Sequence, residues 1–368
     1  MVVFWKWVAS THEEVVMERT PLLYILHSGN LYGTERMALI TAEGLSDRFQ
    51  TTIFAPSGPV HEEAKRRGFS VEEFSTIWDL FCRLQGYWAK HRRLAIMSTG
   101  VWHSILAGFW NVLYRRRPIH LHLVHGGTDE RQSYGRKKWL NQFKIIFVAV
   151  SEFVKQRLIA HGVYSDKILV IENFLSEQRI AETPKRLHFS ASGVRRLIVV
   201  SRVDPIKRVD LLLDALDRTP ALASLQIRVL GAGWDLETLR TRAQARNPNV
   251  TFTGFLPNAL EELAQADLLV HLCPVEPFGL TILEAMAAGV PVLVPDSGGA
   301  GSVVQNGISG FRFRSNDADS LAGRLVELTQ TPAECLNRIV AGGREALASR
   351  FSAEARLADY RSVMEGKN

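Results

Sequence analysis

Short apolar runs alternate with segments of helical spacing along most of the chain. The first such unit starts at Pro21, where the apolar run LLYILH is followed by the turn SGNLYGTER and by MALITAEGL, whose spacing is helical. The runs TTIFAP, HLHLVH, IIFVAVS and ILVIENF continue this rhythm. Strands of a parallel sheet are buried on both faces and therefore read as continuous apolar runs. The first half thus predicts a doubly wound α/β domain.

A second series of the same kind follows a polar stretch. Residues 176–194 lack apolar periodicity, so they predict a domain boundary. Beyond them, RLIVVSRV, QIRVLGAGW, VTFTGFL, DLLVHLCP and VPVLVPD again alternate with helical segments. We expect two doubly wound, Rossmann-like domains, residues 21–184 and residues 185–350, both of ordinary domain size.

Two segments invite a membrane interpretation. Residues 1–20 predict a tail and not a signal peptide, because Lys6 interrupts the apolar start and acidic residues occupy the place of a cleavage site. The alternative is insertion into a membrane interface through Phe4, Trp5 and Trp7. Residues 94–114 are uncharged and long enough to span a bilayer. We interpret them as a strand (94–99) and a helix (101–114), since a βα unit preserves the rhythm of the domain.

Composition excludes several classes of protein. Hydrophobic residues make up 46% and charged residues 22% of the chain, which excludes wholesale disorder, a collagen-like chain and a disulfide scaffold. The cysteines have no paired spacing, which argues against a structural zinc site and fits a reducing, cytoplasmic compartment; they are Cys82, Cys273 and Cys335. The basic charge alone does not indicate nucleic acid as a partner, because no recognition motif accompanies it.

The positive charge is concentrated in the first half. Residues 1–183 contain 23 Lys and Arg against 18 Asp and Glu, whereas the rest of the chain contains 21 against 20. Residues 80–128 carry seven Lys and Arg, three Trp and no acidic residue. Such a surface suits the interface of an anionic bilayer. The alternative is a solvated basic face beside an ordinary core.

The clearest chemical signal is CPVEPFGLTILEAMAAGVPVLVPDSGG, residues 273–299. Glu276 lies in a loop after the strand DLLVHL, and Glu284 lies about one and a half turns into the next helix. The turn between them leaves free backbone N–H groups at the helix start, where anions bind; this turn and helix start comprise Pro277, Phe278, Gly279, Leu280 and Thr281. Carboxylates accept hydrogen bonds from sugar hydroxyls. The segment therefore suits a phosphate flanked by two sugars, as in a sugar nucleotide.

Two cations follow a strand in VVSRVDPIKRVDLLLDAL. Arg202 comes directly after the strand, and Lys207 precedes the next helix. Ligands of open α/β sheets bind at the carboxyl ends of the strands, so both cations are placed to hold a diphosphate. Arg208 fits a solvated surface position better than either neighbour.

Taken together, these motifs resemble the retaining glycosyltransferases of family 4, which have the GT-B fold. The resemblance covers roughly residues 21–350. It implies that the two domains face each other across a cleft and that the C-terminal helix, residues 351–368, returns to the first domain. It rests on five segments: Ser-Arg followed by Lys at 201–207, Gly-x-Gly at 231–233, the Glu-x7-Glu motif with PFGL at 276–284, the run EAMAAGVPVL, and SEFVKQRL at 151–158.

The resemblance implies a role for each motif residue. Arg202 and Lys207 would hold the diphosphate and stabilise the departing nucleotide. Glu276 would bind hydroxyls of the donor sugar, and Glu284 would bind the ribose hydroxyls. Backbone around the helix start would contact sugar and phosphate, and two residues after the strand VTFTG would line the base pocket. These donor contacts are Phe278, Gly279, Leu280, Thr281, Phe255 and Leu256.

The first half offers two further candidates. Gly33 can present its backbone N–H to the diphosphate, because no side chain blocks the approach; an ordinary βα turn is the alternative. His125 ends the strand HLHLVH, where family 4 enzymes often place a histidine that reaches the donor sugar. A buried structural histidine is the alternative for His125, and His120 and His122 fit that structural role better.

We therefore expect a retaining enzyme that moves a hexose from a nucleoside diphosphate sugar, with UDP-glucose as the first choice, to a lipid-linked or saccharide acceptor. The resemblance implies front-face attack through an oxocarbenium-like ion pair, with Arg202 and Lys207 in place of a metal. No cofactor is expected. The alternatives are a GDP-mannose-dependent mannosyltransferase and a nucleotide-sugar-binding protein without catalysis. A cytoplasmic enzyme, attached peripherally to the inner face of the membrane, fits these expectations.

Overall fold

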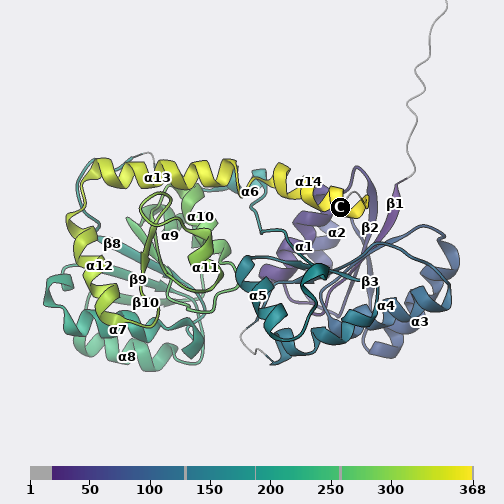
Figure 1. Cartoon of the computed structure of the whole chain (residues 1–368). Coiled ribbons are helices and arrows are strands. Elements are labelled where there is room, and N and C mark those ends of the chain that lie inside the picture. Colours follow the sequence, from purple (N-terminus) through teal and green to yellow (C-terminus); the bar gives the residue numbers. More distant parts are fainter. Residues whose placement is uncertain (1–18, 128–130, 187, 257–258, 367–368) are drawn as a thin grey trace, which may run out of the picture.

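The computed structural model describes residues 19–127, 131–186, 188–256 and 259–366, and it shows two α/β domains side by side (Figure 1). The predicted N-terminal tail lies almost wholly outside the described residues. Within them, the fold class expected from the sequence is confirmed: each domain has a parallel sheet with helices on both faces.

In the described part of the N-terminal domain, seven parallel strands lie in the order β3-β2-β1-β4-β5-β6-β7. The strands are β1 (Thr20–Ile25), β2 (Phe49–Ala55), β3 (Ser70–Glu73), β4 (Ala95–Ser98), β5 (His120–Val124), β6 (Ile146–Ala149) and β7 (Ile168–Val170). The helices are α1 (Gly33–Gly44), α2 (Val60–Arg66), α3 (Ile77–Lys90), α4 (Val101–Leu113), η1 (Arg131–Gly135), η2 (Lys137–Gln142), α5 (Glu152–Ala160), η3 (Ser165–Lys167) and α6 (Glu177–Glu182).

The C-terminal domain has six parallel strands among its described residues, in the order β10-β9-β8-β11-β12-β13. They are β8 (Arg196–Val200), β9 (Gln226–Leu230), β10 (Val250–Gly254), β11 (Leu268–Val270), β12 (Val292–Pro295) and β13 (Phe311–Phe313). The helices are η4 (Pro205–Lys207), α7 (Val209–Arg218), η5 (Pro220–Leu222), α8 (Leu236–Arg246), α9 (Ala259–Gln265), α10 (Leu280–Ala288), α11 (Gly298–Val303), α12 (Ala318–Gln330) and α13 (Ala333–Ala348).

Strand order reverses beside the first strand of each sheet. In the N-terminal sheet β1 lies between β2 and β4, and in the C-terminal sheet β8 lies between β9 and β11. Loops on the two sides of such a switch point diverge and leave a crevice outside the carboxyl ends of the strands. The topology therefore directs the loops after β1, β8 and β11 toward a common region.

Helix α14 (Ala353–Met364) crosses back to the N-terminal domain (Figure 1). Tyr360 and Met364 are buried in the same core as Leu22 of β1. The Arg361 guanidinium donates a 2.6 Å hydrogen bond to the carbonyl oxygen of Gly44, at the end of α1. The last helix thus joins the two domains by packing, in addition to the chain connection through α6.

The uncharged segment 94–114 forms strand β4 and helix α4, as the rhythm of the sequence predicts. β4 is buried along its whole length and pairs with β1 and β5. In the part of the chain that the structure describes, no helix has the length and apolarity needed to cross a bilayer. The stretch 176–194 is less irregular than its composition indicates, because the Ser176 hydroxyl accepts from the backbone N–H of Arg179 and starts the short helix α6.

Candidate active site

A cavity of about 420 Å³ lies between the domains, where the carboxyl ends of both sheets meet. It brings together nine of the residues predicted from the sequence. These are Gly33 and His125 from the N-terminal domain, and Arg202, Lys207, Glu276, Phe278, Gly279, Leu280 and Thr281 from the C-terminal domain. Residues from loops more than 200 positions apart therefore form one site.

The central feature of the cavity is an ion pair. The Lys207 ammonium, from η4 after β8, lies 2.6 Å from Oε2 of Glu276, from the loop after β11, and both side chains are largely buried. His271 adds a third polar group, with Nε2 3.5 Å from the same carboxylate oxygen. A buried carboxylate needs such partners, because an unpaired charge away from water costs several kcal/mol.

The environment of Glu276 keeps its carboxyl group ionised. Burial alone would raise the pKa of Glu276, but the neighbouring His271 and the positive charge of Lys207 outweigh burial and hold the pKa well below its usual range. For Lys207, burial opposes the charged form, and the negative charge of Glu276 overcomes this and raises the pKa. At neutral pH the cavity therefore contains a fixed carboxylate and a fixed ammonium in contact.

Helix α10 begins at the wall of the cavity. Gly279 precedes the helix with φ +93°, a left-handed conformation that suits glycine, and Leu280 and Thr281 form the first turn. The first N–H groups of a helix have no partner inside the helix and carry the positive end of its dipole. This helix start therefore offers an anion site beside Lys207, as the sequence predicts for a phosphate.

The loop before α10 is held in place from both domains. Gly299 of α11 donates a 2.6 Å hydrogen bond to the Glu276 carbonyl, and a Cβ at this position would lie 1.9 Å from the Pro277 carbonyl oxygen. From the N-terminal domain, the Ser151 hydroxyl donates a 2.6 Å hydrogen bond to the same Pro277 oxygen. Ser151 also caps α5 by accepting from the N–H of Val154. The carboxylate of Glu276 is thus carried on a braced backbone.

Arg202 lies at the open side of the cavity. Its guanidinium is 2.6 Å from Oδ2 of Asp204, and 62% of its side chain is exposed, whereas Asp204 is buried. Asp204 also accepts a 3.2 Å hydrogen bond from the N–H of Trp234, which orients the carboxylate. An exposed arginine beside a fixed carboxylate is oriented yet free to receive a phosphate.

His125 and Gly33 form part of the N-terminal wall. Burial lowers the pKa of His125 to about 4, with a smaller contribution from the positive charges of His27 and Lys137, so the imidazole is neutral at pH 7. Its Nε2 is buried, and no hydrogen-bond partner for it occurs among the described residues. Across the cavity, a Cβ on Gly33 would lie 3.7 Å from the Leu280 side chain, so the start of α1 faces the start of α10.

Three predicted donor residues do not line this cavity. Glu284 points to a second cavity, of about 640 Å³, where its Oε1 accepts from Nη2 and Nε of Arg179 at 2.6 and 3.2 Å. Phe255 is 75% exposed, and Leu256 is partly buried against the core that contains α10. The roles of these three residues in binding ribose and base stay predictions.

The sequence alone did not single out several residues of the site. His271 reads as an ordinary residue of an apolar strand, although it lies five positions before Glu276 in the same segment. Arg179 lies in the stretch that appears irregular, 105 positions from its partner Glu284. The remaining additions to the cavity wall are Tyr32, Thr34, Asn173 and Val200, whereas Ser201 and Pro277, which also line it, lie in motifs that the sequence already indicates. His120 and His122 are the buried structural histidines that the sequence predicts, bound to the hydroxyls of Ser98 and Ser104.

Two Rossmann-like domains around a cavity with this anion site define a glycosyltransferase of the GT-B class, and family models agree. Residues 182–346 match the model described as glycosyl transferases group 1, and residues 32–179 match the model described as glycosyltransferase family 4. The chain belongs to glycosyltransferase family 4.

Relatives of known activity differ in their substrates. The N-acetyl-alpha-D-glucosaminyl L-malate synthase of Bacillus anthracis is 26% identical over 202 residues, which span 53% of this chain and 53% of the relative. The match thus covers about half of either protein. The GDP-mannose-dependent alpha-(1-6)-phosphatidylinositol monomannoside mannosyltransferase of Mycobacterium tuberculosis is 26% identical over 337 residues, 85% of this chain and 82% of the relative.

Solved structures share the fold over almost the whole chain. Anabaena HepE in complex with UDP and glucose has a TM-score of 0.77 and 19% identity, and covers 95% of this chain and 100% of its own. The lipopolysaccharide outer core galactosyltransferase WaaB has a TM-score of 0.74 and 17% identity, with coverage of 95% and 100%. At these identities the likeness establishes the fold.

Proposed function

We propose that the chain transfers a hexose from a nucleoside diphosphate sugar to a lipid-linked or saccharide acceptor, with retention of the anomeric configuration. The observation that carries this proposal is the cavity between the domains, where Lys207, Glu276 and the start of α10 adjoin Arg202. Two cations and a helix N-terminus suit a diphosphate, and a buried, ionised carboxylate beside them suits the hydroxyls of a sugar.

UDP-glucose is the donor that we favour. It is our first choice from the sequence, and it is the ligand named for one solved structure of Anabaena HepE, which has a TM-score of 0.76 to this chain. GDP-mannose is the second candidate, because a mannosyltransferase that depends on it matches 85% of this chain. The cavity residues that would hold the diphosphate and sugar suit both donors.

In the proposed reaction, the bond between the anomeric carbon and the diphosphate oxygen breaks while negative charge grows on the diphosphate. Lys207, Arg202 and the N–H groups at the start of α10 stabilise that charge. Glu276 holds the donor sugar hydroxyls and keeps the oxocarbenium-like sugar oriented. The acceptor hydroxyl attacks from the side that the diphosphate leaves, and the diphosphate oxygen takes its proton. His125 enters as a neutral imidazole that contacts the donor sugar.

No divalent metal enters this proposal, because the two cations and the helix start supply the positive charge that the leaving diphosphate requires. We expect full transfer activity in excess EDTA. Loss of activity in EDTA, with recovery on adding Mg²⁺ or Mn²⁺, would show that the phosphate chemistry is different. A cytoplasmic location with peripheral attachment to the membrane is part of the proposal, since a lipid-linked acceptor has to be reached at a bilayer.

The decisive experiment is a thermal-shift screen of the chain against UDP-, GDP- and ADP-sugars, followed by a donor-hydrolysis assay. A ligand at 100 times its Kd adds roughly 2.7 kcal/mol of stability, which is a readily measured shift. We expect stabilisation by a UDP-sugar that is lost in Arg202→Ala. No stabilisation by any nucleotide sugar would overturn the proposal, and stabilisation without slow hydrolysis or transfer would favour the non-catalytic alternative.

A further inference from the structure

Helix α4 is apolar on the side that faces solvent. Its inner side contributes Ser104, Ala107, Gly108 and Trp110 to the domain, all of them buried. The opposite side carries only apolar residues, and its exposed members are Trp102 (52%), Phe109 (47%), Val112 (71%) and Leu113 (59%). A surface helix normally turns polar residues outward, so an uncharged helix with this outer side points to an apolar environment.

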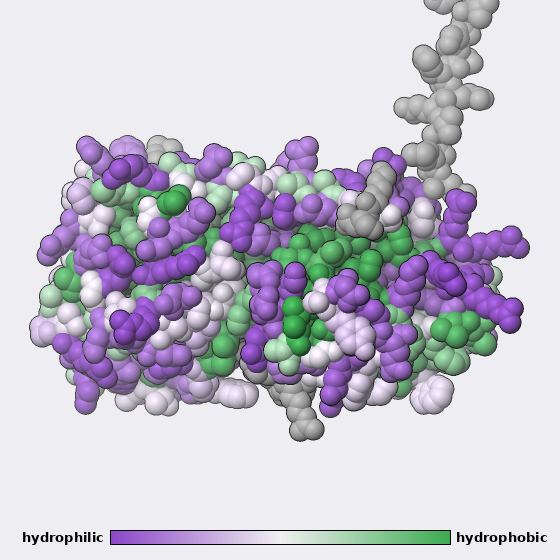
Figure 2. Space-filling view, viewed as in Figure 1, coloured by the Kyte–Doolittle hydropathy of each residue, from purple (hydrophilic) through white to green (hydrophobic). Residues whose placement is uncertain are grey.

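Neighbouring elements extend this apolar surface. The Trp102 ring lies 6.0 Å from the Trp139 ring of η2, and the Phe109 ring lies 5.7 Å from the Phe81 ring of α3. Phe81 in turn lies 5.7 Å from the exposed ring of Trp78. We name this surface the α3–α4 face; its exposed residues are Ile77, Trp78, Trp102, Phe109, Val112, Leu113 and Trp139. Figure 2 shows apolar side chains gathered over the end of the domain that carries α3 and α4, beside protruding hydrophilic ones.

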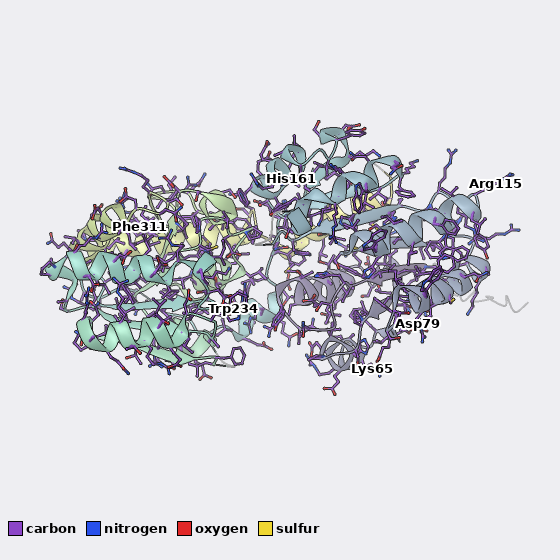
Figure 3. The ribbon with its side chains drawn as sticks, turned by 90° about the horizontal axis from the view of Figure 1, so that it is seen from below. Lys65, Asp79, Arg115, His161, Trp234 and Phe311 are labelled. Carbon is purple, nitrogen blue, oxygen red and sulfur yellow. The ribbon has the colours of Figure 1, made fainter. Side chains whose placement is uncertain are left out.

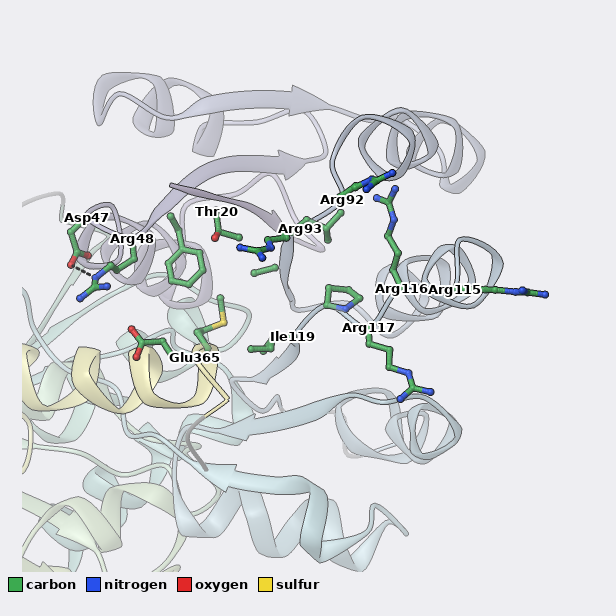
Figure 4. Close-up of a pocket in the computed structure, with 15 residues that line it drawn as sticks. Thr20, Asp47, Arg48, Arg92, Arg93, Arg115, Arg116, Arg117, Ile119 and Glu365 are labelled. Carbon is green, nitrogen blue, oxygen red and sulfur yellow. Dashed lines mark ion pairs between the residues drawn. The ribbon is translucent and has the colours of Figure 1, made fainter. Parts of the chain in front are cut away.

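Arginines border the far end of the α3–α4 face. They follow the last turn of α4 or precede β4, and with Arg48 they line a cavity of about 640 Å³ (Figure 4). We name them the arginine rim: Arg92, Arg93, Arg115, Arg116 and Arg117. Within the described ranges, no carboxylate lies within 4 Å of Arg92, Arg93, Arg115 or Arg117. Figure 3 places Arg115 at the end of the N-terminal domain farthest from the C-terminal domain.

We propose that the α3–α4 face docks on an anionic lipid bilayer, with the apolar side chains in the interface and the arginine rim on lipid phosphates. Tryptophan beside aliphatic residues suits the boundary between headgroups and acyl chains, and clustered arginines are attracted by anionic lipids. A protein partner would have to be acidic to account for the arginine rim, whereas an anionic bilayer matches both parts of the surface.

The direction of α4 links this surface to the cavity. β4 ends at Ser98 on the cleft edge of its sheet, α4 begins there at Val101, and the rim lies at the opposite edge before β5. A helix of 13 residues is about 20 Å long, so a bilayer along α4 extends from the rim to the cleft edge. This geometry assigns the acceptor to the class of lipid-linked sugars embedded in a membrane. The assignment rests on the proposed function, because it requires that the chain transfers a sugar.

The test is flotation of the full chain with vesicles of phosphatidylcholine, with and without phosphatidylglycerol. We expect binding only to the anionic vesicles and release by high salt. Arg115→Gln with Arg117→Gln should weaken binding about 25-fold, since each arginine near the surface contributes about fivefold. Val112→Ser with Leu113→Ser should weaken it about tenfold through lost apolar insertion. The matched control, Arg218→Gln with Arg314→Gln on the C-terminal domain, removes the same charge and should bind like the wild type.

Several outcomes overturn the proposal. One is that the wild type does not bind anionic vesicles, and a second is that the control and rim variants lose vesicle binding equally. A third is that Val112→Ser with Leu113→Ser binds vesicles like the wild type, which would assign binding to another segment such as residues 1–18. Self-association of the wild type that this variant abolishes would assign the face to a second copy of the chain. Calorimetric titration with UDP in the absence of vesicles should give the same affinity in every variant. Wild-type failure to bind UDP would contradict UDP-glucose as the donor. Failure to bind either UDP or GDP would contradict the proposed function and leave the docking result standing.

Discussion

The two walls of the cavity differ in charge. The C-terminal wall presents Arg202, Lys207 and Glu276, whereas the described N-terminal wall presents Tyr32, Gly33, Thr34, Asn173 and a neutral His125. Charge that changes during the proposed reaction arises on the diphosphate, and the charged groups that respond to it lie on one domain only. The uncharged wall can then complement the shape and hydroxyls of sugar and acceptor, while the cations of the opposite wall bind the phosphates.

Helices α4 and α10 extend this comparison beyond the cavity. Each follows a strand at the cleft edge of its sheet, begins after a glycine and is rich in apolar residues. Six of the nine residues of α10 are buried, and its charged residue, Glu284, is neutralised by Arg179. The outer side of α4 stays exposed, and arginines follow its end. Apolar composition alone therefore does not determine whether a helix is buried or exposed. The charges at the ends of the helix and the elements beside it distinguish the two cases.

The largest effect is expected at the charged wall. Arg202→Ala and Lys207→Ala should each lower kcat by about 100- to 1,000-fold, because they remove charge that stabilises the departing diphosphate. Steady-state kinetics with the donor found by the screen measure this. Lys207→Ala also leaves Glu276 buried without its cation, so its fold has to be checked by circular dichroism. Arg202 is mostly exposed, so Arg202→Ala tests the role in catalysis with little effect on folding. Near-normal kcat in both variants would refute the role of these cations in stabilising the diphosphate.

The two carboxylates of the C-terminal domain should separate by function. Glu276→Gln should leave UDP affinity nearly intact and slow transfer, since we propose that this carboxylate binds the reacting sugar. Glu284→Gln should weaken UDP binding, as expected for a ribose ligand. Loss of a charged hydrogen-bond partner costs about 1.5–3 kcal/mol, or roughly 10- to 100-fold. Calorimetric titration of UDP compares the variants.

The observed ion pair of Glu284 with Arg179 makes this comparison sharper. Arg179→Gln is the matched variant, because it removes the partner and leaves the carboxylate. If Glu284 serves only to hold Arg179 and α6, both variants should lose stability and keep UDP affinity. Equal loss of UDP affinity in Glu276→Gln and Glu284→Gln would show that the two carboxylates do not divide the donor between them.

The fold and the charged wall were predictable from the sequence for the same physical reason. Strands buried on both faces leave continuous apolar runs, and a polar residue directly after such a run lies at the carboxyl end of the sheet. Arg202 follows this pattern directly, whereas Lys207 and Glu276 lie further along the loops that leave β8 and β11 at the same edge. Arg179 could not be found in this way, because its pairing with Glu284 depends on how the domains pack. The exposure of α4 could not be predicted either, because a buried and an exposed apolar helix have similar sequences.

A steric prediction concerns the brace of the Glu276 loop. Gly299→Ala should destabilise the protein by about 1–3 kcal/mol and lower kcat, because the new Cβ meets the Pro277 carbonyl at 1.9 Å and displaces the loop that carries Glu276. Gly323→Ala in α12 is the control, since no atom lies within 4 Å of its Cβ position. It should raise stability by about 0.5–1 kcal/mol. Thermal unfolding and kinetics of both variants test the brace. An active, stable Gly299→Ala enzyme would show that close packing of Gly299 against Pro277 does not position the Glu276 loop.

The smallest expected effect concerns acid and separates the two domains. Burial lowers the pKa of His120 to about 3 and that of His103 to about 4. The folded N-terminal domain therefore binds fewer protons than its unfolded chain, whose histidines titrate near 6.5. Its stability should fall as the pH drops below about 6.5, by up to about 1.4 kcal/mol per pH unit for each such histidine. Glu276, whose pKa is depressed, stabilises the C-terminal domain until the pH falls below the usual range of a carboxylate.

Hydrogen exchange between pH 7.5 and 5 can follow the domains separately, through peptides of β4 and β5 and of β11 and β12. Protection of the N-terminal strands should decline over this interval, while the C-terminal strands stay protected. His120→Gln keeps a group that can bond the Ser98 hydroxyl and removes one titrating site, so it should reduce the decline by one histidine's share. His188→Gln, at an exposed position, is the control and should change nothing. A parallel decline of both domains would show that the buried histidines do not set the acid sensitivity of the N-terminal domain.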